Sequence, residues 1–452
     1  MIYRRPHSPP HLLTLTAGVL LTTSCVGEGA DIDPADVWPQ DVSITPSEFV
    51  SNVVTVAWHT DEPTTGVVSA TAPDGETWSG RSDTPAKEHE VALLGLPEGA
   101  EVEISVTTER EGASATSEPV PTSIPWSWSG LAGLTVEEGA PGYRLTTAIT
   151  PLPDPNVPDV VIFDDRGRAV WAVALPSDQP ATSAKLSSDR STLFVITGAE
   201  IWAYSLAGDS VRQSILGDLH HDCEPIPGGG VLVIQRVLRS LGEESVTADR
   251  VLLLEPDETS RVVWDSIEHL DELPPPIGEP VDGVRELTHA NSIRFDEPTG
   301  DVLLSLARMG AILRFSLETG EHRWVISPFG GPLPATPEPV LLSHQAVFTE
   351  TGIAVFANYT KGESCSRVLD FSTDDEAMTF STSNTYSDPD CLESVALGGL
   401  ADAGLGRRLI SWSTAGVLDV IDADDQRLAR IAAPLGVGFG YAAWHDSLYP
   451  VE

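Results

Sequence analysis

A short β-strand unit recurs along the chain from about residue 124 onward, and this repeat most constrains the fold. In each copy an apolar strand leads through a polar turn to a second strand, which often ends in tryptophan. The spacing of roughly 40–60 residues is typical of propeller blades, and no long stretch shows helical periodicity. We therefore predict an all-β chain with a six-bladed β-propeller over residues 124–452, with five or seven blades as alternatives. The repeated strands lie at 161–163, 201–204, 251–254, 312–315, 367–371 and 417–421.

Residues 41–123 follow a different pattern, in which apolar and polar residues alternate. Val54, Val56 and Trp58 share one side of a strand, and 102–106 repeats this alternation. A period of two is typical of half-buried strands. The sequence predicts a small fibronectin/immunoglobulin-like β-sandwich before the propeller, acting as a spacer.

The N-terminus has the pattern of an export signal. Arg4 and Arg5 precede a short apolar run at 12–21, and the segment ending in Cys25 resembles a bacterial lipobox. We predict a lipoprotein-type signal peptide over 1–25, lipidation of Cys25 and a flexible tether over 26–40. The protein is then expected in the cell envelope, periplasm-facing and bound to the membrane only through this anchor. The alternative is plain secretion.

Charge and cysteine content narrow the function further. The formal net charge of −41 opposes binding to nucleic acid, so no nucleic-acid partner is expected. In an oxidising compartment we expect a disulfide between Cys365 and Cys391, which lie in neighbouring stretches of one repeat. Cys223 is expected to be a small buried residue.

Three histidines stand at the same place in three successive repeats. His221, His289 and His344 are each followed within roughly a dozen residues by a glycine turn and an apolar strand. Because the same register in each blade is the same strand, these side chains are expected to converge on one central channel. His220 is adjacent to His221, and neighbouring residues on a strand point to opposite faces, so only one of the two is expected there. No metal is predicted.

These motifs resemble the bacterial aryl-sulfate sulfotransferases, which need no phosphoadenylyl-sulfate (PAPS) donor. The most specific match is His-Ala-Asn-Ser at 289–292, followed by the strand at 300–305. The His-His-Asp run at 220–222 and the segment from His344 to Asn358 also look like the family. The resemblance covers residues 124–452, and a β-sandwich before a six-bladed propeller is the family's domain order.

The resemblance implies ping-pong sulfuryl transfer from a small aryl sulfate to a phenol, without a cofactor. His344 takes the place of the nucleophile that forms a sulfohistidine. His221 (or His220), His289 and Asn291 take the anion-binding and proton-handling positions, and Asn358 is assigned to substrate binding. A neutral imidazole is a competent nucleophile near neutral pH, and fixed donors stabilise sulfuryl oxygens.

The sequence departs from the family at two places. The family's Ser-x-Arg is Ser305-Leu306-Ala307-Arg308 here, which displaces the sulfate-clamping arginine by one residue unless a bulge restores it. The run from Phe356 also lacks the family's Asp and Gly. Two alternatives therefore remain open: a non-catalytic propeller lipoprotein that binds a partner or a small anion, and a quinoprotein-type dehydrogenase.

Overall fold

The computed structural model describes residues 34–449, apart from 138, 178, 281–282, 328–342, 359–364 and 375–378. The described chain is almost entirely β-strand, and its helical segments are five 3-10 turns. Among these residues no helix has the length and apolar character needed to cross a membrane. The predicted signal peptide, the lipidated Cys25 and most of the tether lie outside the described residues. The turns are η1 (Pro34–Val37), η2 (Ser129–Leu131), η3 (Leu270–Glu272), η4 (Ala307–Met309) and η5 (Ser413–Ala415).

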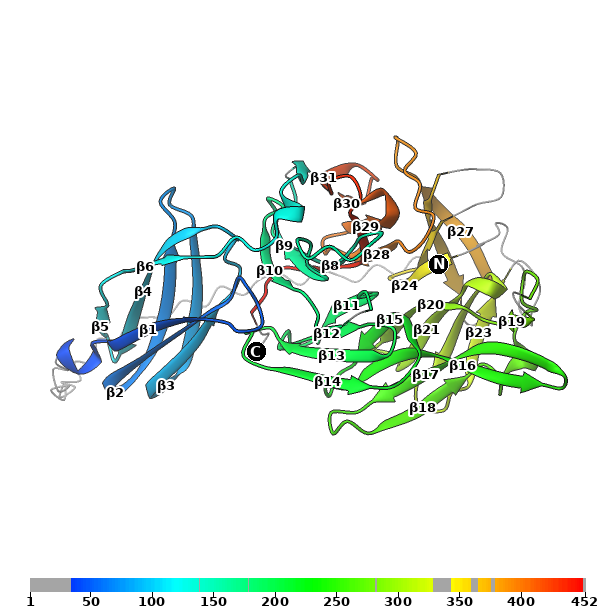
Figure 1. Cartoon of the computed structure of the whole chain (residues 1–452), viewed down its shortest axis with the longest axis horizontal. Helices are drawn as coiled ribbons and strands as arrows, with labels where there is room; N and C mark the ends of the chain where they lie inside the picture. The colour runs from blue at the N-terminus through cyan, green and yellow to red at the C-terminus, as the bar shows by residue number, and fades with distance from the viewer. Residues whose placement is uncertain are drawn as a thin grey trace, which may run out of the picture.

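The first six strands form one hydrogen-bonded sheet with its own core, drawn in blue and cyan in Figure 1. The long hairpin of β2 and β3 runs through this sheet, and the core gathers the alternating residues Val54, Val56 and Trp58. The pairing describes one continuous sheet, so the fibronectin-like sandwich stays a prediction. The strands are β1 (Gln40–Pro46), β2 (Val54–Thr71), β3 (Thr77–Leu93), β4 (Glu101–Arg110), β5 (Ala113–Thr116) and β6 (Val120–Ser123).

The remaining described strands form six antiparallel sheets of four main strands each, blades 1 to 6. Blade 1 contains β8 (Tyr143–Ile149), β9 (Val160–Phe163), β10 (Ala169–Val173) and the last strand, β32 (Gly438–His445). Blade 2 contains β11 (Ser183–Leu186), β12 (Thr192–Ile196), β13 (Glu200–Ser205) and β14 (Val211–Ile215). Blade 3 contains β15 (Leu219–Pro225), β16 (Val231–Leu241), β17 (Glu244–Leu254) and β18 (Ser260–Asp265), and β19 (Val284–Glu286) pairs with β17.

Blades 4 to 6 follow in chain order. Blade 4 contains β20 (Ala290–Asp296), β21 (Asp301–Leu306), β22 (Ala311–Ser316) and β23 (His322–Ile326). Blade 5 contains β24 (Ser343–Thr349), β25 (Gly352–Ala357), β26 (Arg367–Asp374) and β27 (Thr379–Tyr386). Blade 6 contains β28 (Gly399–Asp402), β29 (Arg408–Trp412), β30 (Val417–Ile421) and β31 (Arg427–Ala432), with β7 (Thr135–Glu137) added at its outer edge.

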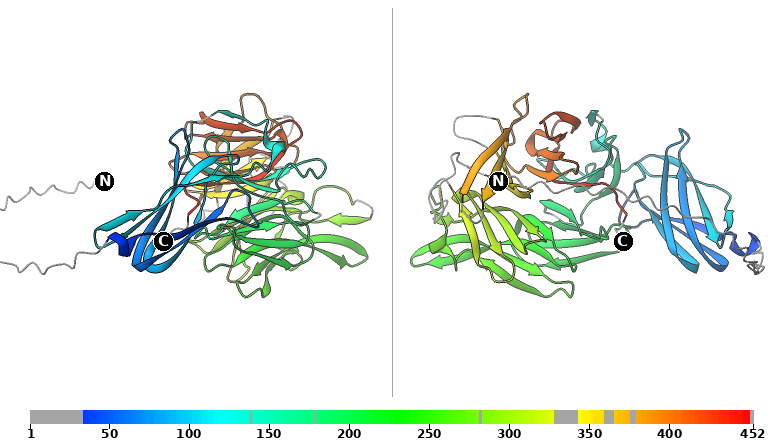
Figure 2. Two further views of the ribbon diagram at one scale, coloured as in Figure 1. Left: turned by 60° about the vertical axis from the view of Figure 1, so that its left-hand side comes forward. Right: turned by 180° about the vertical axis from the view of Figure 1, so that it is seen from behind.

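The innermost strands of the six blades contact one another in a closed ring, in the order β32, β11, β15, β20, β24 and β28. The ring closes because the C-terminal strand β32 pairs with β8 of the first blade. This arrangement is a β-propeller and confirms the predicted all-β class (Figures 1 and 2).

Tryptophans pack between neighbouring blades. Trp171 is fully buried against residues of blade 2, and its indole N–H donates to the carbonyl of Leu206. Trp264 packs in the core shared by blades 3 and 4, and Trp324 in the core shared by blades 4 and 5. Their apolar area stabilises the contact between adjacent sheets.

The N-terminal sheet is attached to blade 1 by polar contacts. The guanidinium of Arg168 reaches both carboxylate oxygens of Glu76, at 2.6 and 2.7 Å. The amide N–H of Leu94 donates to the hydroxyl of Tyr449, which follows β32 in the chain. The sheet is therefore fixed beside blade 1.

Candidate functional site

The predicted histidines lie where the inner strands of blades 3, 4 and 5 are interrupted. The pairing register shifts between Leu219 and Cys223, between Ala290 and Ser292, and between Ser343 and Ala346. A bulge inserts extra residues on one strand and re-aims their side chains. The irregularity thus presents the histidines of blades 3 and 5, whereas His289 directly precedes β20 and has a left-handed backbone of its own, with φ of 50°.

Four imidazole rings gather at these bulges, with His221 in the middle. Its ring centroid lies 5.0 Å from that of His220, 4.9 Å from His289 and 6.1 Å from His344. The expectation that only one of His220 and His221 reaches the cluster is wrong. His221 has a left-handed backbone, with φ of 61°, which breaks the alternation of the strand and lets both rings reach it.

His220 is held by a buried carboxylate. Its Nε2 lies 2.9 Å from Oδ1 of Asp249, whose other oxygen accepts hydrogen bonds from the Thr288 hydroxyl and the Ala290 amide. Burial raises the pKa of Asp249, but the charge and hydrogen bond of His220 outweigh this and lower it below its usual range. The ionised carboxylate can only accept, so Nε2 of His220 carries a proton.

The tautomer of His221 depends on the protonation of His220, because the Nδ1 atoms of the two rings lie 2.7 Å apart. One of these atoms must donate and the other accept. Burial lowers the pKa of the His221 imidazole well below its ordinary value, and positive charge on His220 and the other histidines lowers it further. A neutral His221 offers an Nε2–H donor when His220 is cationic, and an Nε2 lone pair when His220 is neutral.

His289 is linked to Arg308 through Glu286. Nδ1 of His289 lies 2.6 Å from one oxygen of Glu286, and Nε of Arg308 lies 2.9 Å from the other. The hydrogen bond with His289 is the main cause that lowers the pKa of Glu286 to about 2, despite partial burial. The pairing of β21 with β22 has no bulge that would move Arg308 back to the position of the family's arginine. Arg308 lies in the turn η4, just after β21.

His344 is oriented by Asn358. Both amide hydrogens of Asn358 are used by backbone carbonyls, those of Ser394 and Leu397, each at 2.7 Å. The side-chain oxygen of Asn358 therefore faces Nδ1 of His344. This amide oxygen can only accept a hydrogen bond, so Nδ1 carries the proton. The prediction that Asn358 binds substrate is wrong, because its amide is occupied within the protein behind His344.

Asn291 lies in the bulge of blade 4 and is completely buried. Its amide nitrogen donates to the carbonyl of Ser343 at 2.8 Å, and its backbone carbonyl accepts from the hydroxyl of Tyr441. Within the described residues its side-chain oxygen has no hydrogen-bond partner. The side chain fixes blade 4 to blade 5 and offers an acceptor rather than the predicted anion donor.

Asp222 does not complete a metal site with the adjacent histidines. Its carboxylate accepts from the hydroxyl of Ser183 at 2.7 Å and pairs with Lys185 and Arg294, each at 2.9 Å. Cations occupy the positions that a metal would need.

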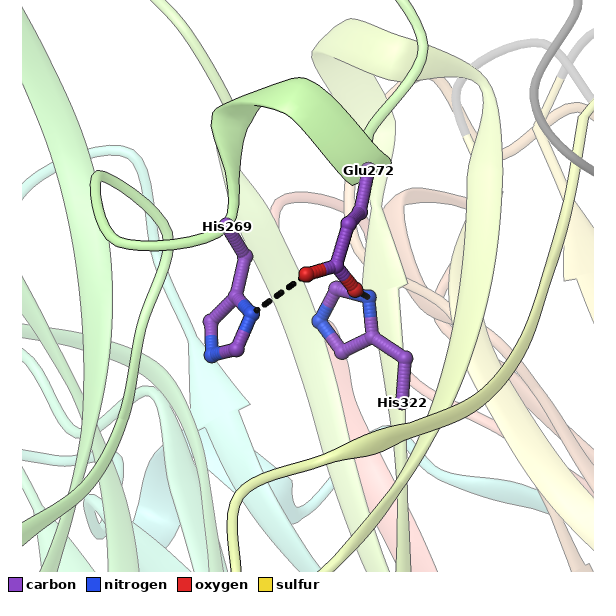
Figure 3. A group of neighbouring side chains, drawn as sticks. All are labelled: His269, Glu272 and His322. Carbon is purple, nitrogen blue, oxygen red and sulfur yellow. Dashed lines mark hydrogen bonds and ion pairs between the residues drawn. The ribbon is translucent and has the colours of Figure 1, made fainter.

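A second histidine group, formed by the turn η3 and the outer strand β23, offers metal-ligand atoms within 4.8 Å of one another: His269, Glu272 and His322 (Figure 3). Nε2 of His322 accepts a hydrogen bond from the indole of Trp264 at 3.0 Å. An indole only donates, so the neutral His322 carries its proton on Nδ1, the atom that lies 3.0 Å from Glu272. His322 then has no lone pair directed at an ion shared with His269 and Glu272. The group therefore acts as a contact between blades.

A pocket of about 200 Å³ lies beside the histidine cluster and shares Glu286 and Arg308 with it. Thr247, Ile277 and Val284 line its other walls. The pocket is therefore polar on the side of the cluster and partly apolar on the other.

The cysteines follow the sequence analysis. Cys365 and Cys391 form a disulfide, and Cys223 is fully buried. Burial raises the pKa of the Cys223 thiol to about 12, so it stays protonated and is a poor nucleophile.

One family model, that of the arylsulfotransferases (ASST), matches residues 143–390. The match covers more than half of the chain and includes all four clustered histidines. The chain belongs to the arylsulfotransferase family. Membership supports an arylsulfotransferase-type function in general and specifies neither the sulfuryl donor nor the acceptor. No curated protein sequence matches the chain.

Solved structures give only distant likenesses to this arylsulfotransferase-family chain. The β-propeller domain of Cps50 (Swd1) from Myceliophteria thermophila has 13% identity and a TM-score of 0.41, over 70% of this chain and 93% of that one. The periplasmic gluconolactonase PpgL of Pseudomonas aeruginosa has 12% identity and a TM-score of 0.39, over 66% and 99%. A streptogramin B lyase has 12% identity and a TM-score of 0.38, over 67% and 88%. At these scores the likenesses carry no argument about activity.

Asp249 and Glu286 are the site residues that the sequence analysis missed. Glu286 precedes His289 by three residues, so a Glu-x-x-His spacing was available as a signal. Asp249 lies in a different strand from His220, and only strand pairing brings it close. No local pattern marks such a residue.

Proposed function

We propose that this protein transfers a sulfuryl group from an aryl sulfate ester to a phenol, without PAPS, through a sulfohistidine at His344. The observation that carries the proposal is the fixed tautomer of this histidine. Its Nδ1–H is bound to Asn358, so Nε2 holds the lone pair that a nucleophile requires.

The first step forms a bond between Nε2 of His344 and sulfur and breaks the bond between sulfur and the aryl oxygen. The electron pair leaves on the phenolate oxygen, which takes a proton from a neighbouring imidazolium. In the second step a phenol oxygen attacks sulfur, the nitrogen–sulfur bond breaks, and the phenol proton passes to the same imidazole. His289 fits this proton role, because Glu286 stabilises its cationic form.

The arrangement also supplies donors for the sulfuryl oxygens. A cationic His220 makes His221 an Nε2–H donor, and the guanidinium of Arg308 is bound to the same carboxylate, Glu286, that holds His289. Donors fixed before the reaction cost no reorganisation when charge develops on the transferred group.

The remaining parts of the proposal concern the location. We propose that the mature protein carries a lipid on Cys25 and acts in the cell envelope on small aryl sulfates and phenols. The acidic chain gives no support to a nucleic-acid partner.

The test compares wild type with His344→Ala, using a chromogenic aryl sulfate and a phenol acceptor. We expect His344→Ala to lose transfer and wild type to gain the mass of one sulfuryl group on the peptide that contains His344. The matched control is His269→Ala, a histidine outside the cluster, which is expected to keep activity. If wild type transfers no sulfuryl group from any aryl sulfate, the non-catalytic alternative is the better description.

A further inference from the structure

Glu286 is a single carboxylate that joins two members of the candidate site. One oxygen lies 2.6 Å from Nδ1 of His289, and the other lies 2.9 Å from Nε of Arg308. His289 and Arg308 flank the open end of the β20–β21 hairpin, His289 just before β20 and Arg308 just after β21, whereas Glu286 comes from the preceding blade. In the described part of the chain, this carboxylate is the group that links the two side chains.

The backbone around Glu286 is fixed on both sides. Glu286 is paired with Thr247 of β17, and the next residue, Leu287, donates to the Thr247 carbonyl. The amide N–H of Arg308 donates to the Thr288 carbonyl at 3.0 Å. Both partners of the ion pair therefore stand on backbone that hydrogen bonds hold in place.

The link determines which nitrogen of His289 is available. A carboxylate with a pKa of about 2 is ionised throughout the working range, and it accepts but does not donate. Nδ1 of His289 therefore keeps its proton, and proton exchange takes place at Nε2. The adjacent negative charge also favours the imidazolium that forms when His289 takes a proton.

The link also bears on the displaced arginine. Arg308 stands one residue later than the family's arginine, in the turn η4 rather than on the strand. Glu286 binds its Nε and leaves the two terminal nitrogens for other partners, beside the pocket that Glu286 and Arg308 both line. The guanidinium thus stays at the histidine cluster despite the shift.

We propose that Glu286 is a positioning residue for sulfuryl transfer, which fixes the tautomer of His289 and holds Arg308 at the site. The inference rests on the proposed function, and it adds a residue that does not itself touch the transferred group. In the second step the phenol proton moves to Nε2 of His289 while Nδ1–H stays bound to Glu286.

The experiment measures kcat and KM against pH for wild type and Glu286→Gln with a chromogenic aryl sulfate. We expect kcat to fall by about ten- to hundredfold, the range typical of partners that orient a histidine. The pH dependence of kcat should also change, because glutamine carries no charge and its amide can donate to Nδ1 of His289 as well as accept from it. KM should rise as well, because Arg308 is no longer held.

The matched control is Glu244→Gln. Glu244 lies in the same blade and pairs with Nε of Arg285 at 2.7 Å, away from the histidines. It should show the wild-type pH profile. A Glu286→Gln profile that also coincides with wild type overturns the positioning role, whereas a wild type without any transfer contradicts the proposed function instead.

A second measurement does not depend on a variant that folds. Nitrogen-15 NMR of the histidines in the intact protein should show His289 protonated on Nδ1 at neutral pH. A lone pair on Nδ1 overturns the inference whether or not the enzyme turns over.

Discussion

Each of three clustered histidines has one ring nitrogen fixed by an oxygen acceptor from elsewhere in the chain. The acceptors are Asp249 for His220, Glu286 for His289 and Asn358 for His344. Two of them are charged and one is neutral, and this difference matters. The carboxylates favour cationic imidazoles, whereas the amide of Asn358 fixes a tautomer without adding charge, which suits a neutral nucleophile.

Replacing Asn358 with alanine tests that assignment. Asn358→Ala removes the acceptor from Nδ1 of His344, so the ring can take the wrong tautomer or turn away. We expect kcat to fall by about ten- to hundredfold. The measurement is the rate of aryl-sulfate cleavage together with the melting temperature.

The control for this prediction is Ser366→Ala. The hydroxyl of Ser366 bonds to the backbone carbonyls of Asn358 and Ser394 but not to His344. It should lower stability by about 1 kcal/mol, as for one lost hydrogen bond, with little change in kcat. Equal losses of kcat in both variants would mean that Asn358 acts only through stability.

At the level of the strands, the bulges on β15, β20 and β24 lie at or next to the four histidines. The outer strand pairs of these three blades carry register shifts as well, and the sheets still pack. The contacts between outer strands are independent of the site. One of them, the hydrogen bond from Trp264 of blade 3 to His322 of blade 4, depends on pH.

Acidification should weaken this contact between blades. Burial, followed by the charge of His269, lowers the pKa of His322 to about 4, against about 6.5 for an unperturbed histidine. The unfolded chain therefore binds the proton more readily, so the stability from the neutral ring is complete above about pH 6.5 and is lost as pH falls toward 4.

The comparison is His322→Gln, whose amide oxygen can still accept from Trp264 but does not titrate. Unfolding in urea at several pH values should show a smaller loss of stability between pH 6.5 and 4 in the variant than in wild type. Parallel curves would show that His322 does not titrate in this window.

For the whole molecule, ring closure depends on the last strand. β32 pairs with β8 and contacts β11 and β28, so it connects the first blade to the second and the last. It buries Phe439, Tyr441 and Trp444. Loss of one large buried aromatic side chain costs about 3–5 kcal/mol, and native proteins have only about 5–15 kcal/mol in total.

A chain that ends before Gly438 should therefore not form the closed propeller. Circular dichroism and thermal melting are expected to show no cooperative transition in this truncated chain. A chain that ends after Asp446 keeps β32 and loses the buried side chain of Leu448 and the Tyr449 contact to Leu94, so it should melt cooperatively at a lower temperature. A cooperative transition near the wild-type temperature in the shorter chain would show that β32 is dispensable.

The sequence alone determined the all-β class and the propeller, because period-two strands and a fixed repeat length are local patterns. It also identified the histidines, because residues at the same position in each repeat fall on the same strand of each blade. It also indicated the disulfide between Cys365 and Cys391, which lie just before β26 and shortly after its neighbour β27.

Only the tertiary structure decided what surrounds each ring. The left-handed backbone of His221 interrupts the alternation of the strand, so His220 and His221 do not point to opposite faces as expected. Asp249 reaches His220 across a strand pair, and Asn358 faces inward because two carbonyls take its amide hydrogens. Bulges and hydrogen bonds between strands depend on contacts distant in sequence, which local periodicity does not contain.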